Sequence, residues 1–455
     1  MPHESPCGHL SGVDVPNPII WIIIMSRDLF ACVAFVLLAT VTEFVIADDW
    51  PQWRGPKRDG VWRETGIVER FEQPQLPYLW RQPISSGYCG PTVAKGRVYV
   101  MDRQTQPKQI ERVLCFNASD GAPIWQHTYP AVYAISYEAG PRASVTIYDD
   151  RAFALGAMGL LHCFDAATGN VRWKVDLQQA YEIKMPVWGI AAAPLIVDDL
   201  VVLHIGGKNA TVVALDKATG EQRWTALSDR PSYSAPVLIE QAGRRVVACW
   251  NGDSVAGLNP ESGDVYWRFP FPPSRMPIGV ATPVVDGDRL FVSSFYDGSL
   301  LLRLHEDRMA VSKIWQRRGS NERSTDSLHC MISTPVIHGD YIYGVDSYGE
   351  LRCLEASSGD RVWEDLGATP PGRWSNIHIV RNGDRYWMFN EAGELIIGTL
   401  SSRGFREISR TKLLQPTLDQ LRRRGGVCWS HPAFANRRVF ARNDMELVSA
   451  SLAAE

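Results

Sequence analysis

The sequence contains none of the short motifs that identify several large classes of enzymes and metal proteins. Nine cysteines occur among 455 residues, yet they form no Cys-x-x-Cys pair and no His/Cys cluster with zinc spacing. A nucleophile elbow, a phosphate-binding glycine loop and a His-Glu-x-x-His motif are also missing. We therefore assign no catalytic residue and no metal ligand from the sequence.

An excess of charge of one sign is missing as well. The chain carries 47 basic and 50 acidic residues, which gives a formal net charge of −3 and an isoelectric point of about 6.4. Proteins that bind nucleic acids present clustered Lys and Arg to the phosphate backbone. We therefore expect no nucleic-acid partner.

An apolar run near the N-terminus has the form of an export signal. Residues 25–27 (MSR) supply a start with a positive charge, residues 29–41 are apolar, and residues 45–47 (VIA) match a small-residue cleavage site. We predict that residues 1–47 are a signal-peptide region with translation starting at Met25. The mature chain is then exported, periplasmic or extracellular, with no transmembrane span. An uncleaved anchor is the alternative.

A short motif repeated about every 40–50 residues organises the rest of the chain. Residues 214–224 read ALDKATGEQRW, in which an apolar pair is followed by Asp, by Thr-Gly, and by Trp four residues after the glycine. Similar copies end at Trp125, Trp173, Trp267 and Trp363, and looser copies run through 304–315 and 400–408. Repeats of this period are typical of β-propellers and solenoids.

Each part of the motif has a structural reason. Asp216 suits a turn because its short side chain accepts hydrogen bonds from nearby backbone amides. Gly220 suits the same turn because it adopts positive φ at little cost. The large ring of Trp224 can pack against the next unit from an outer strand. We interpret the motif as the last hairpin of a propeller blade, and the predicted docking residues are Trp80, Trp125, Trp173, Trp224, Trp267, Trp315 and Trp363.

A second signature, a small residue followed by Pro and two apolar residues, precedes each hairpin. Residues 282–292 (TPVVDGDRLFV) and 334–343 (TPVIHGDYIY) show it most clearly. Proline is tolerated as the first residue of a strand, and Gly-Asp pairs are typical of hairpin turns. Each unit thus has four short strands. The predicted units are 87–125, 141–173, 189–224, 232–267, 277–315, 331–363, 373–408 and 428–453.

The last unit supplies only three strands. Residues 76–81 (LPYLWR) offer the missing outer strand from the other end of the chain. This closure leaves no open sheet edge. The sequence therefore predicts an all-β, eight-bladed β-propeller over residues 75–455 as a single domain, preceded by an N-terminal extension, residues 48–74. A seven-bladed ring is the alternative.

The cysteines of the predicted propeller are expected to be structural. Cys115, Cys163 and Cys353 occupy the same strand position of the repeat, as expected of small buried apolar residues. Cys89 and Cys428 begin the inner strands of the first and last blades, which are neighbours in a closed ring. Whether these two form a disulfide is left open.

The connections between blades are the longest and least repetitive parts of the predicted ring. They are rich in aromatic residues, and loops on a rigid scaffold commonly carry function. We predict that they form a funnel at the channel for a planar or sugar-like ligand or a peptide, although packing of the loops onto the ring explains the same residues. The predicted funnel residues are Tyr133, Arg142, Trp188, Tyr233, Arg275, His329, Arg373, Trp374, Asn376 and Trp429.

On these repeats the chain resembles an exported bacterial member of the PQQ-like (pyrroloquinoline-quinone-type) repeat β-propellers. The resemblance rests on the motif at 214–224 and its copies across 75–453, and residues 49–56 (DWPQWRGP) are similar to the start of exported members. The family includes BamB-like propellers, which have eight blades and bind protein partners without a cofactor. It also includes quinoprotein dehydrogenases, which hold PQQ and Ca²⁺ in the channel and oxidise alcohols or sugars.

The sequence departs from both groups in particular features. The Cys-Cys pair of many dehydrogenases is missing, and their catalytic Asp and their Glu and Asn ligands have no matching motif here. The lipobox of BamB-like lipoproteins is missing too. We predict a non-catalytic binding or scaffold protein of the cell envelope, without cofactor, whose partner is a protein or a glycan. The alternatives are a PQQ- and Ca²⁺-dependent alcohol or sugar dehydrogenase and a carbohydrate-binding propeller.

Overall fold

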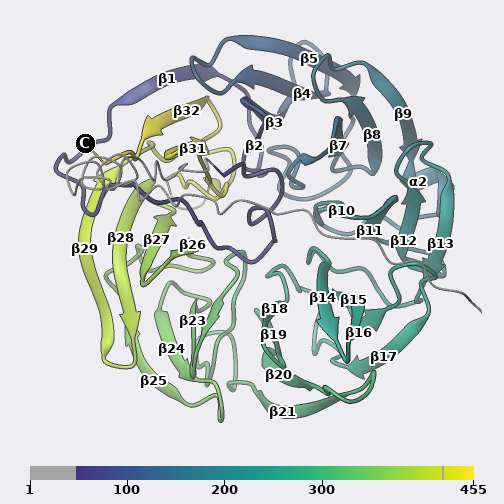
Figure 1. The fold of residues 1–455 in the computed structure, drawn as a ribbon, viewed down its shortest axis with the longest axis vertical. Coiled ribbons are helices and arrows are strands. Elements are labelled where there is room, and N and C mark those ends of the chain that lie inside the picture. Colours follow the sequence, from purple (N-terminus) through teal and green to yellow (C-terminus); the bar gives the residue numbers. More distant parts are fainter. Residues whose placement is uncertain (1–47, 423–424, 455) are drawn as a thin grey trace, which may run out of the picture. The chain divides into compact units, whose positions relative to one another are not determined.

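A computed structural model describes residues 48–422 and 425–454 of the chain. The signal-peptide region predicted for residues 1–47 lies outside these residues. The described chain forms a ring of eight four-stranded antiparallel sheets around a central channel (Figure 1). The prediction of an eight-bladed propeller is confirmed, and the seven-bladed alternative is wrong.

Seven blades each use four consecutive strands, called a to d from the channel outward. Blade 1 comprises β2 (Thr92–Ala94), β3 (Arg97–Gln104), β4 (Ile110–Asn117) and β5 (Pro123–Pro130). Blade 2 comprises β6 (Thr146–Tyr148), β7 (Arg151–Leu155), β8 (Leu160–Asp165) and β9 (Val171–Asp176), followed by the one-turn helix α2 (Leu177–Ala180). Blade 3 comprises β10 (Leu195–Val197), β11 (Leu200–Gly207), β12 (Ala210–Asp216) and β13 (Gln222–Ala226). Blade 4 comprises β14 (Val237–Gln241), β15 (Arg244–Trp250), β16 (Ser254–Leu258) and β17 (Val265–Pro270).

The second half of the ring repeats this arrangement. Blade 5 comprises β18 (Val284–Asp286), β19 (Arg289–Ser294), β20 (Gly298–Leu304) and β21 (Val311–Arg317). Blade 6 comprises β22 (Val336–His338), β23 (Tyr341–Val345), β24 (Leu351–Glu355) and β25 (Arg361–Asp365). Blade 7 comprises β26 (Ile377–Asn382), β27 (Arg385–Asn390), β28 (Glu394–Ser401) and β29 (Gly404–Lys412). Blade 8 takes β30 (Ala433–Ala435), β31 (Arg438–Arg442) and β32 (Glu446–Ser451) from the C-terminal end and β1 (Tyr78–Pro83) from the N-terminal end.

The pairing of β1 with β32 closes the ring. The two strands run antiparallel, with Tyr78 opposite Ala450 and Pro83 opposite Glu446. The predicted outer strand at residues 76–81 is therefore confirmed, with bounds shifted by two residues. Because every blade then has its fourth strand, each sheet is complete.

The antiparallel order gives the ring two different faces. The a–b and c–d turns lie at one end of the strands. The b–c turns and the long connections from strand d to the next strand a lie at the other end. We call the second face the connection face.

The blades dock through tryptophan rings that lie on glycines of the next blade. On five such glycines an added Cβ would lie 2.6–2.9 Å from a ring atom of the docking tryptophan, so a larger residue would separate the blades. The pairs are Trp80 on Gly121, Trp125 on Gly169, Trp173 on Gly220, Trp224 on Gly263 and Trp315 on Gly359. Each of these indoles also donates its N–H to a backbone carbonyl of the same neighbouring blade, at 2.8–3.1 Å.

Trp267 docks through an intermediary, because the c–d turn of blade 5 has no matching glycine. Its indole N–H donates to Gln241 Oε1 at 2.8 Å, within its own blade. The amide nitrogen of Gln241 then donates to three carbonyls of the blade 5 turn, those of His305, Arg308 and Ala310. Trp363 donates to Ser401 O of blade 7 at 2.8 Å.

Residues 48–62 enter the channel and touch most of the ring (Figure 1). Trp50 pairs with Val93 of blade 1, and Ile147 of blade 2 donates its N–H to Pro51 O. The guanidinium of Arg58 donates to carbonyls of blades 3 and 4, those of Ala193, Pro194 and Pro236. We call residues 48–62 the channel segment.

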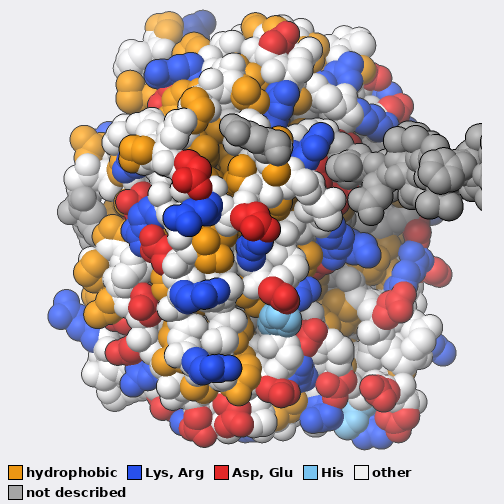
Figure 2. All heavy atoms as spheres, turned by 60° about the vertical axis from the view of Figure 1, so that its left-hand side comes forward, with side chains coloured by type: hydrophobic (Ala, Val, Ile, Leu, Met, Phe, Trp, Pro, Cys, Tyr) orange, Lys and Arg blue, Asp and Glu red, His pale blue; other side chains and the backbone are white. Residues whose placement is uncertain are grey.

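The described cysteines are all buried and unpaired, and Cys89 and Cys428 are among them. Figure 2 shows basic, acidic and apolar side chains interspersed over the side of the ring that carries β28 and β29, in keeping with the small net charge. Across residues 48–422 and 425–454, no helix has the length and hydropathy needed to cross a membrane.

Candidate ligand cavity on the propeller axis

A cavity of about 160 Å³ lies on the axis of the ring, and it is partly open. All eight connections contribute to its wall. In ring order, starting with the connection from blade 8 to blade 1, the connections supply Tyr88, Tyr137, Arg142, Ser144, Trp188, Ala191, Ala193, Tyr233, Ala235, Val280, Thr282, Met331, Ile332, Trp374, Trp429 and His431. Trp53 and His378 complete the lining. The cavity is therefore a product of the whole ring and is not assembled by any single blade.

Trp53 of the channel segment also lines the cavity. Its indole N–H donates to Thr282 Oγ1 of blade 5 at 2.7 Å. Its ring packs edge-on against His431 of blade 8, with centroids 4.5 Å apart, and against His378 of blade 7 at 6.4 Å. A residue of the N-terminal extension thus joins three blades at the cavity.

Four aromatic rings of the wall contact one another in sequence, and they come from the connections that lead into blades 4, 3, 2 and 7. Tyr233 lies 4.9 Å from Trp188, Trp188 lies 6.2 Å from Tyr137, and Tyr137 lies 5.8 Å from Trp374, all as centroid distances. The rings meet tilted or edge-to-face, which is the arrangement that aromatic quadrupoles favour. This wall offers ring faces and edges to an occupant.

The charged and titratable groups at the cavity are held in a neutral or fully bonded state. Burial lowers the pKa of His378 to about 4 and that of His431 to about 3, so both imidazoles are neutral at pH 7. The guanidinium of Arg142 donates to the carbonyls of Gly140, Ser136 and Tyr137. The cavity is therefore mainly apolar, with one cation that is already bonded to backbone.

The connections that form the wall are held by a repeated contact. In five blades an Asp near the end of strand b accepts a backbone N–H from the connection that leads into the same blade, at 2.6–3.1 Å. The donor and acceptor pairs are Ser85 and Asp102, Arg230 and Asp253, Ser274 and Asp297, His329 and Asp346, and Asp419 and Asp444. We call this contact the connection latch.

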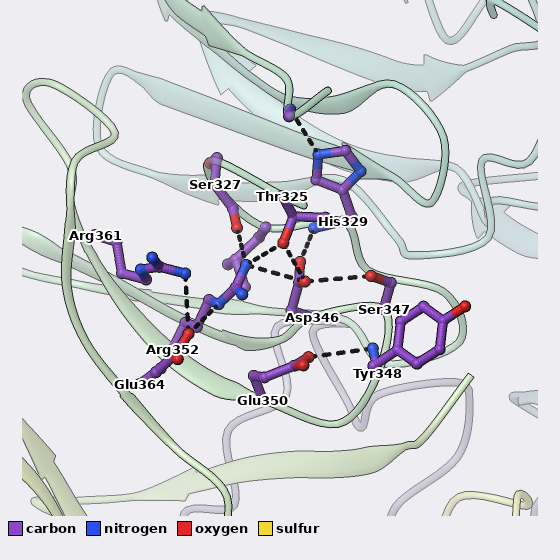
Figure 3. Close-up of polar contacts among 12 residues, drawn as sticks. Thr325, Ser327, His329, Asp346, Ser347, Tyr348, Glu350, Arg352, Arg361 and Glu364 are labelled. Atoms are coloured by element: carbon purple, nitrogen blue, oxygen red, sulfur yellow. Dashed lines mark hydrogen bonds and ion pairs between the residues drawn. The ribbon is translucent and has the colours of Figure 1, made fainter. Parts of the chain in front are cut away.

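The latch of blade 6 is the most elaborate. Asp346 accepts from the backbone N–H of His329, from Thr325 Oγ1 and from the buried guanidinium of Arg352 at 2.9 Å (Figure 3). Arg352 also donates to Ser327 O at 2.7 Å. The ion pair thus fixes the connection that supplies Met331 to the cavity.

Five of the ten predicted funnel residues line this cavity: Arg142, Trp188, Tyr233, Trp374 and Trp429. They come from five different connections, and the ring brings them together. The indole N–H of Trp429 donates to Glu391 at 3.2 Å, and Trp188 donates its backbone N–H to Tyr233 Oη at 3.4 Å.

The other five predicted residues hold the connections in place and do not line the cavity. Tyr133 donates its hydroxyl to the buried Glu111, and His329 is buried beside Phe295 O. Arg373 pairs with Glu322 at 2.7 Å. Asn376 accepts from Ser333, and Arg275 lies over the ring of Tyr296. For these residues the packing explanation fits the structure.

The sequence analysis missed the residues that precede the strand-a prolines. Ala193, Ala235, Thr282 and His431 each stand directly before a proline of the second signature, and all four line the cavity. The signature marks where strand a begins beside the channel. The position before each proline could therefore have been predicted to line the channel. Trp53 had no such signal, because its segment lies outside the repeats.

The described residues contain no group of three or more His, Cys, Asp or Glu side chains placed to hold a metal ion. Two polar side chains of the wall, those of Ser144 and His431, lie in contact, with Oγ and Nε2 2.6 Å apart. His431 is held by its Nδ1 near Pro432 O at 3.2 Å.

Comparison with known proteins places the chain among propellers of this type. Residues 109–365 match the model of a family described as outer membrane protein assembly factor BamB. The outer membrane protein assembly factor BamB of Yersinia pestis is 24% identical over 277 residues. That match covers 58% of this chain and 65% of the relative, just under two thirds of its length.

Two solved structures share the fold at low sequence identity. The crystal structure of BamB from Moraxella catarrhalis has a TM-score of 0.54 and 17% identity, and the match covers 82% of this chain and 97% of that one. The quinohemoprotein alcohol dehydrogenase from Comamonas testosteroni has a TM-score of 0.61 and 12% identity, covering 93% of this chain and 84% of that one. These likenesses concern the fold alone.

Proposed function

We propose, from the premise that this chain belongs to the family of the outer membrane protein assembly factor BamB, that the protein is an exported binding or scaffold module of the cell envelope. In this role it acts without catalysis and without a cofactor, and its partner is a protein. The surface that meets the partner is the connection face.

The single observation that carries the proposal is the distribution of exposed apolar side chains. Among the described residues, the five most exposed large apolar side chains are 50–69% exposed, and all lie on the connection face. They are Val132, Val187, Leu366, Leu418 and Met445. Exposed apolar residues grouped on one face are typical of protein interaction surfaces.

The rigidity of the ring supports the same role. The docked tryptophans and the connection latches hold the connections on a closed scaffold, so a partner meets a preformed surface. Preformed surfaces lose little conformational entropy on binding. The connection face also surrounds the cavity, which gives it an aromatic centre.

The test is site-specific photo-crosslinking of the full chain in its native cell. A photoreactive residue is placed at Val132, Val187 or Met445 on the connection face. Matched controls carry it at Val171 and Val265, which are 40% and 47% exposed on outer strands of the ring. We expect crosslinks to one envelope protein from the connection face and none from the outer strands.

Two results would contradict the proposal. One is a crosslinking pattern that does not differ between the two sets of positions. The other is recovery of the chain in the cytoplasmic fraction. A separate titration addresses the dehydrogenase alternative: saturable, Ca²⁺-dependent stabilisation of the chain by PQQ, followed by dye-linked oxidation of an alcohol or sugar, would replace the scaffold role with an enzymatic one.

A further inference from the structure

We infer that the connection face carries a docking site for an acidic polypeptide segment, formed by arginine and tyrosine side chains at blades 5, 6 and 7. The inference rests on the proposed function, since it names the chemistry of the partner that the connection face would meet. The site consists of six side chains, which we call the arginine cluster: Arg275, Tyr296, Glu322, Arg323, Tyr348 and Arg373.

The cluster lies on the connection face because every member stands in a connection or in a b–c turn. The connections that lead into blades 5, 6 and 7 supply the charged members, and the b–c turns of blades 5 and 6 supply Tyr296 and Tyr348. Segments about a hundred residues apart in the chain thus contribute to one site, which the ring holds together.

The centre of the cluster shows how it binds a carboxylate. Glu322 accepts from two nitrogens of the Arg373 guanidinium, at 2.7 and 3.1 Å, and from the hydroxyl of Tyr348 at 3.0 Å. The hydrogen bond from Arg373 lowers the pKa of Glu322 below its ordinary value, and the charge of Arg275 acts in the same direction. An arginine and a tyrosine together therefore stabilise an ionised carboxylate here.

Each end of the cluster repeats the arginine–tyrosine pair without a carboxylate. The guanidinium of Arg275 lies over the ring of Tyr296, 5.0 Å from its centroid. The guanidinium of Arg323 lies 5.2 Å from the ring centroid of Tyr348 and donates to its hydroxyl at 3.3 Å. Both arginines are exposed, and within residues 48–422 and 425–454 neither forms an ion pair. The two ends can therefore receive carboxylates from a ligand.

The charge of the cluster and its place on the face favour an acidic protein segment. Three guanidiniums and one carboxylate leave an excess of two positive charges, although the chain as a whole carries a net charge of −3. Planar guanidiniums bind carboxylates through two parallel hydrogen bonds. Leu366, which is 57% exposed, stands in the same connection as Arg373. Complementary charge beside exposed apolar residues is typical of protein interfaces.

The test measures binding of an acidic peptide to the purified full chain by fluorescence anisotropy. The probe is a labelled decapeptide with four glutamates, and the reference is the same peptide with glutamine at those four positions. We expect saturable binding of the acidic peptide that weakens as the salt concentration rises. The glutamine peptide should not bind saturably.

Two double variants locate the binding. Arg275→Gln combined with Arg323→Gln removes both free cations and should weaken the acidic peptide about tenfold. The chain offers a matched control at Arg308 and Arg403, which are exposed in c–d turns on the opposite face. Arg308→Gln combined with Arg403→Gln changes the net charge equally and should leave the affinity unchanged. All four arginines are exposed, so we expect both double variants to keep the melting temperature of the parent chain.

The inference is overturned if the two peptides bind alike or if the two double variants behave alike. Vesicles of phosphatidylglycerol provide a further arm. Vesicle binding that exceeds peptide binding and is lost in the Arg275→Gln, Arg323→Gln variant would assign the cluster to a lipid surface and also overturn it.

Failure of this inference is distinguishable from failure of the proposed function. Crosslinks from Val132, Val187 and Met445 to an envelope protein, without binding of the acidic peptide, would keep the scaffold role and overturn the cluster as its docking site. Binding of the acidic peptide that depends on the cluster, without such crosslinks, would support the acidic-segment site and contradict the scaffold role.

Discussion

The ring of Trp224 in blade 3 lies flat on Gly263 of blade 4, and a Cβ on that glycine would lie 2.6 Å from the ring carbon Cε3. The indole N–H of Trp224 donates to Pro260 O in the same turn at 3.0 Å. The glycine of the repeat therefore has two tasks. It permits the positive φ of the turn, here +77°, and it leaves room for the ring of the preceding blade.

These two tasks can be separated by mutation. Gly287 also has positive φ, at +57°, but an added Cβ there meets nothing within 4 Å. Gly287→Ala should cost about 1–2 kcal/mol of unfolding free energy, from backbone strain alone. Gly263→Ala should cost about 1–3 kcal/mol more, because the methyl group displaces Trp224. Urea unfolding of both variants provides the comparison, and equal losses would contradict the docking role of the glycine.

Removing the ring tests the same contact from the other side. Trp224→Ala should lower the free energy of unfolding by about 3–5 kcal/mol, the usual cost of truncating a buried aromatic. In the double variant with Gly263→Ala the clash is gone, so the two losses should not add. A double-mutant cycle measures this coupling, and additive losses would show that the two residues do not interact.

The channel segment should contribute to the stability of the whole ring. Burial lowers the pKa of Arg58 to about 9, and the guanidinium still bonds to blades 3 and 4. Arg58→Ala leaves three buried carbonyls without this donor and should cost about 2–4 kcal/mol. Lys57 is exposed beside it, so Lys57→Ala should change stability by less than about 0.5 kcal/mol. Thermal unfolding of the two variants checks the difference.

The buried ion pair of blade 6 should behave differently from a surface pair. Asp346 and Arg352 are 2% and 5% exposed. Asp346→Ala leaves the buried guanidinium with Glu364, at 3.2 Å, as its remaining ion partner and should cost about 3 kcal/mol. Asp307 and Arg308 form an exposed pair of similar length, at 2.9 Å. Asp307→Ala should change stability by about 0.5 kcal/mol or less. Denaturant midpoints of the two variants report the contrast.

Stability should fall on acidification because of the two buried histidines of the cavity. The folded-state pKa values of His378 and His431, about 4 and about 3, lie below the ordinary value of 6.5. Between these values and pH 6.5 the unfolded chain binds more protons than the folded chain. Stability is therefore full above pH 6.5 and decreases as the pH falls, by about 1.4 kcal/mol per pH unit for each group.

The variant His431→Gln isolates one of these contributions. Glutamine keeps a polar partner for Ser144 but does not titrate. The slope of unfolding free energy against pH between 6.5 and 4.5 should be smaller in the variant by about 1.4 kcal/mol per unit. Parallel curves for the wild type and the variant would contradict the prediction.

The sequence predicted the ring well because the repeat encodes local structure. Asp216, Gly220 and Trp224 specify a turn and the contact with the neighbouring blade within a few residues, and the pattern recurs around the ring. Even the outer strand borrowed by blade 8 was predictable, because the last unit lacked one. The docking of Trp267 was not predictable from its own copy of the motif. That copy is regular, but the docking depends on Gln241 and on the turn of blade 5, which lie outside it.

The cavity was predictable only in part, for reasons of distance along the chain. Trp188 and Trp374 were identifiable because each stands in an aromatic connection. Tyr133 stands in one too, but a buried carboxylate, Glu111, holds it away from the cavity, and nothing near it in the sequence signals that contact. Trp53 was missed because its segment has no repeat partner, and its position depends on residues more than two hundred places away.

The closure of blade 8 has a consequence for how the chain is made. β1 is synthesised among the first parts of the propeller, while its partner β32 is synthesised last. The channel segment meets blades 7 and 8 only at the same late stage, because the backbone N–H of Arg381 donates to Gly60 O and the ring of Trp62 packs against Phe434. Until then β1 has an unpaired edge, and the channel segment lacks its contacts with blades 7 and 8. A chain that ends before β32 would therefore leave the edge of β1 without a partner, and such edges promote aggregation.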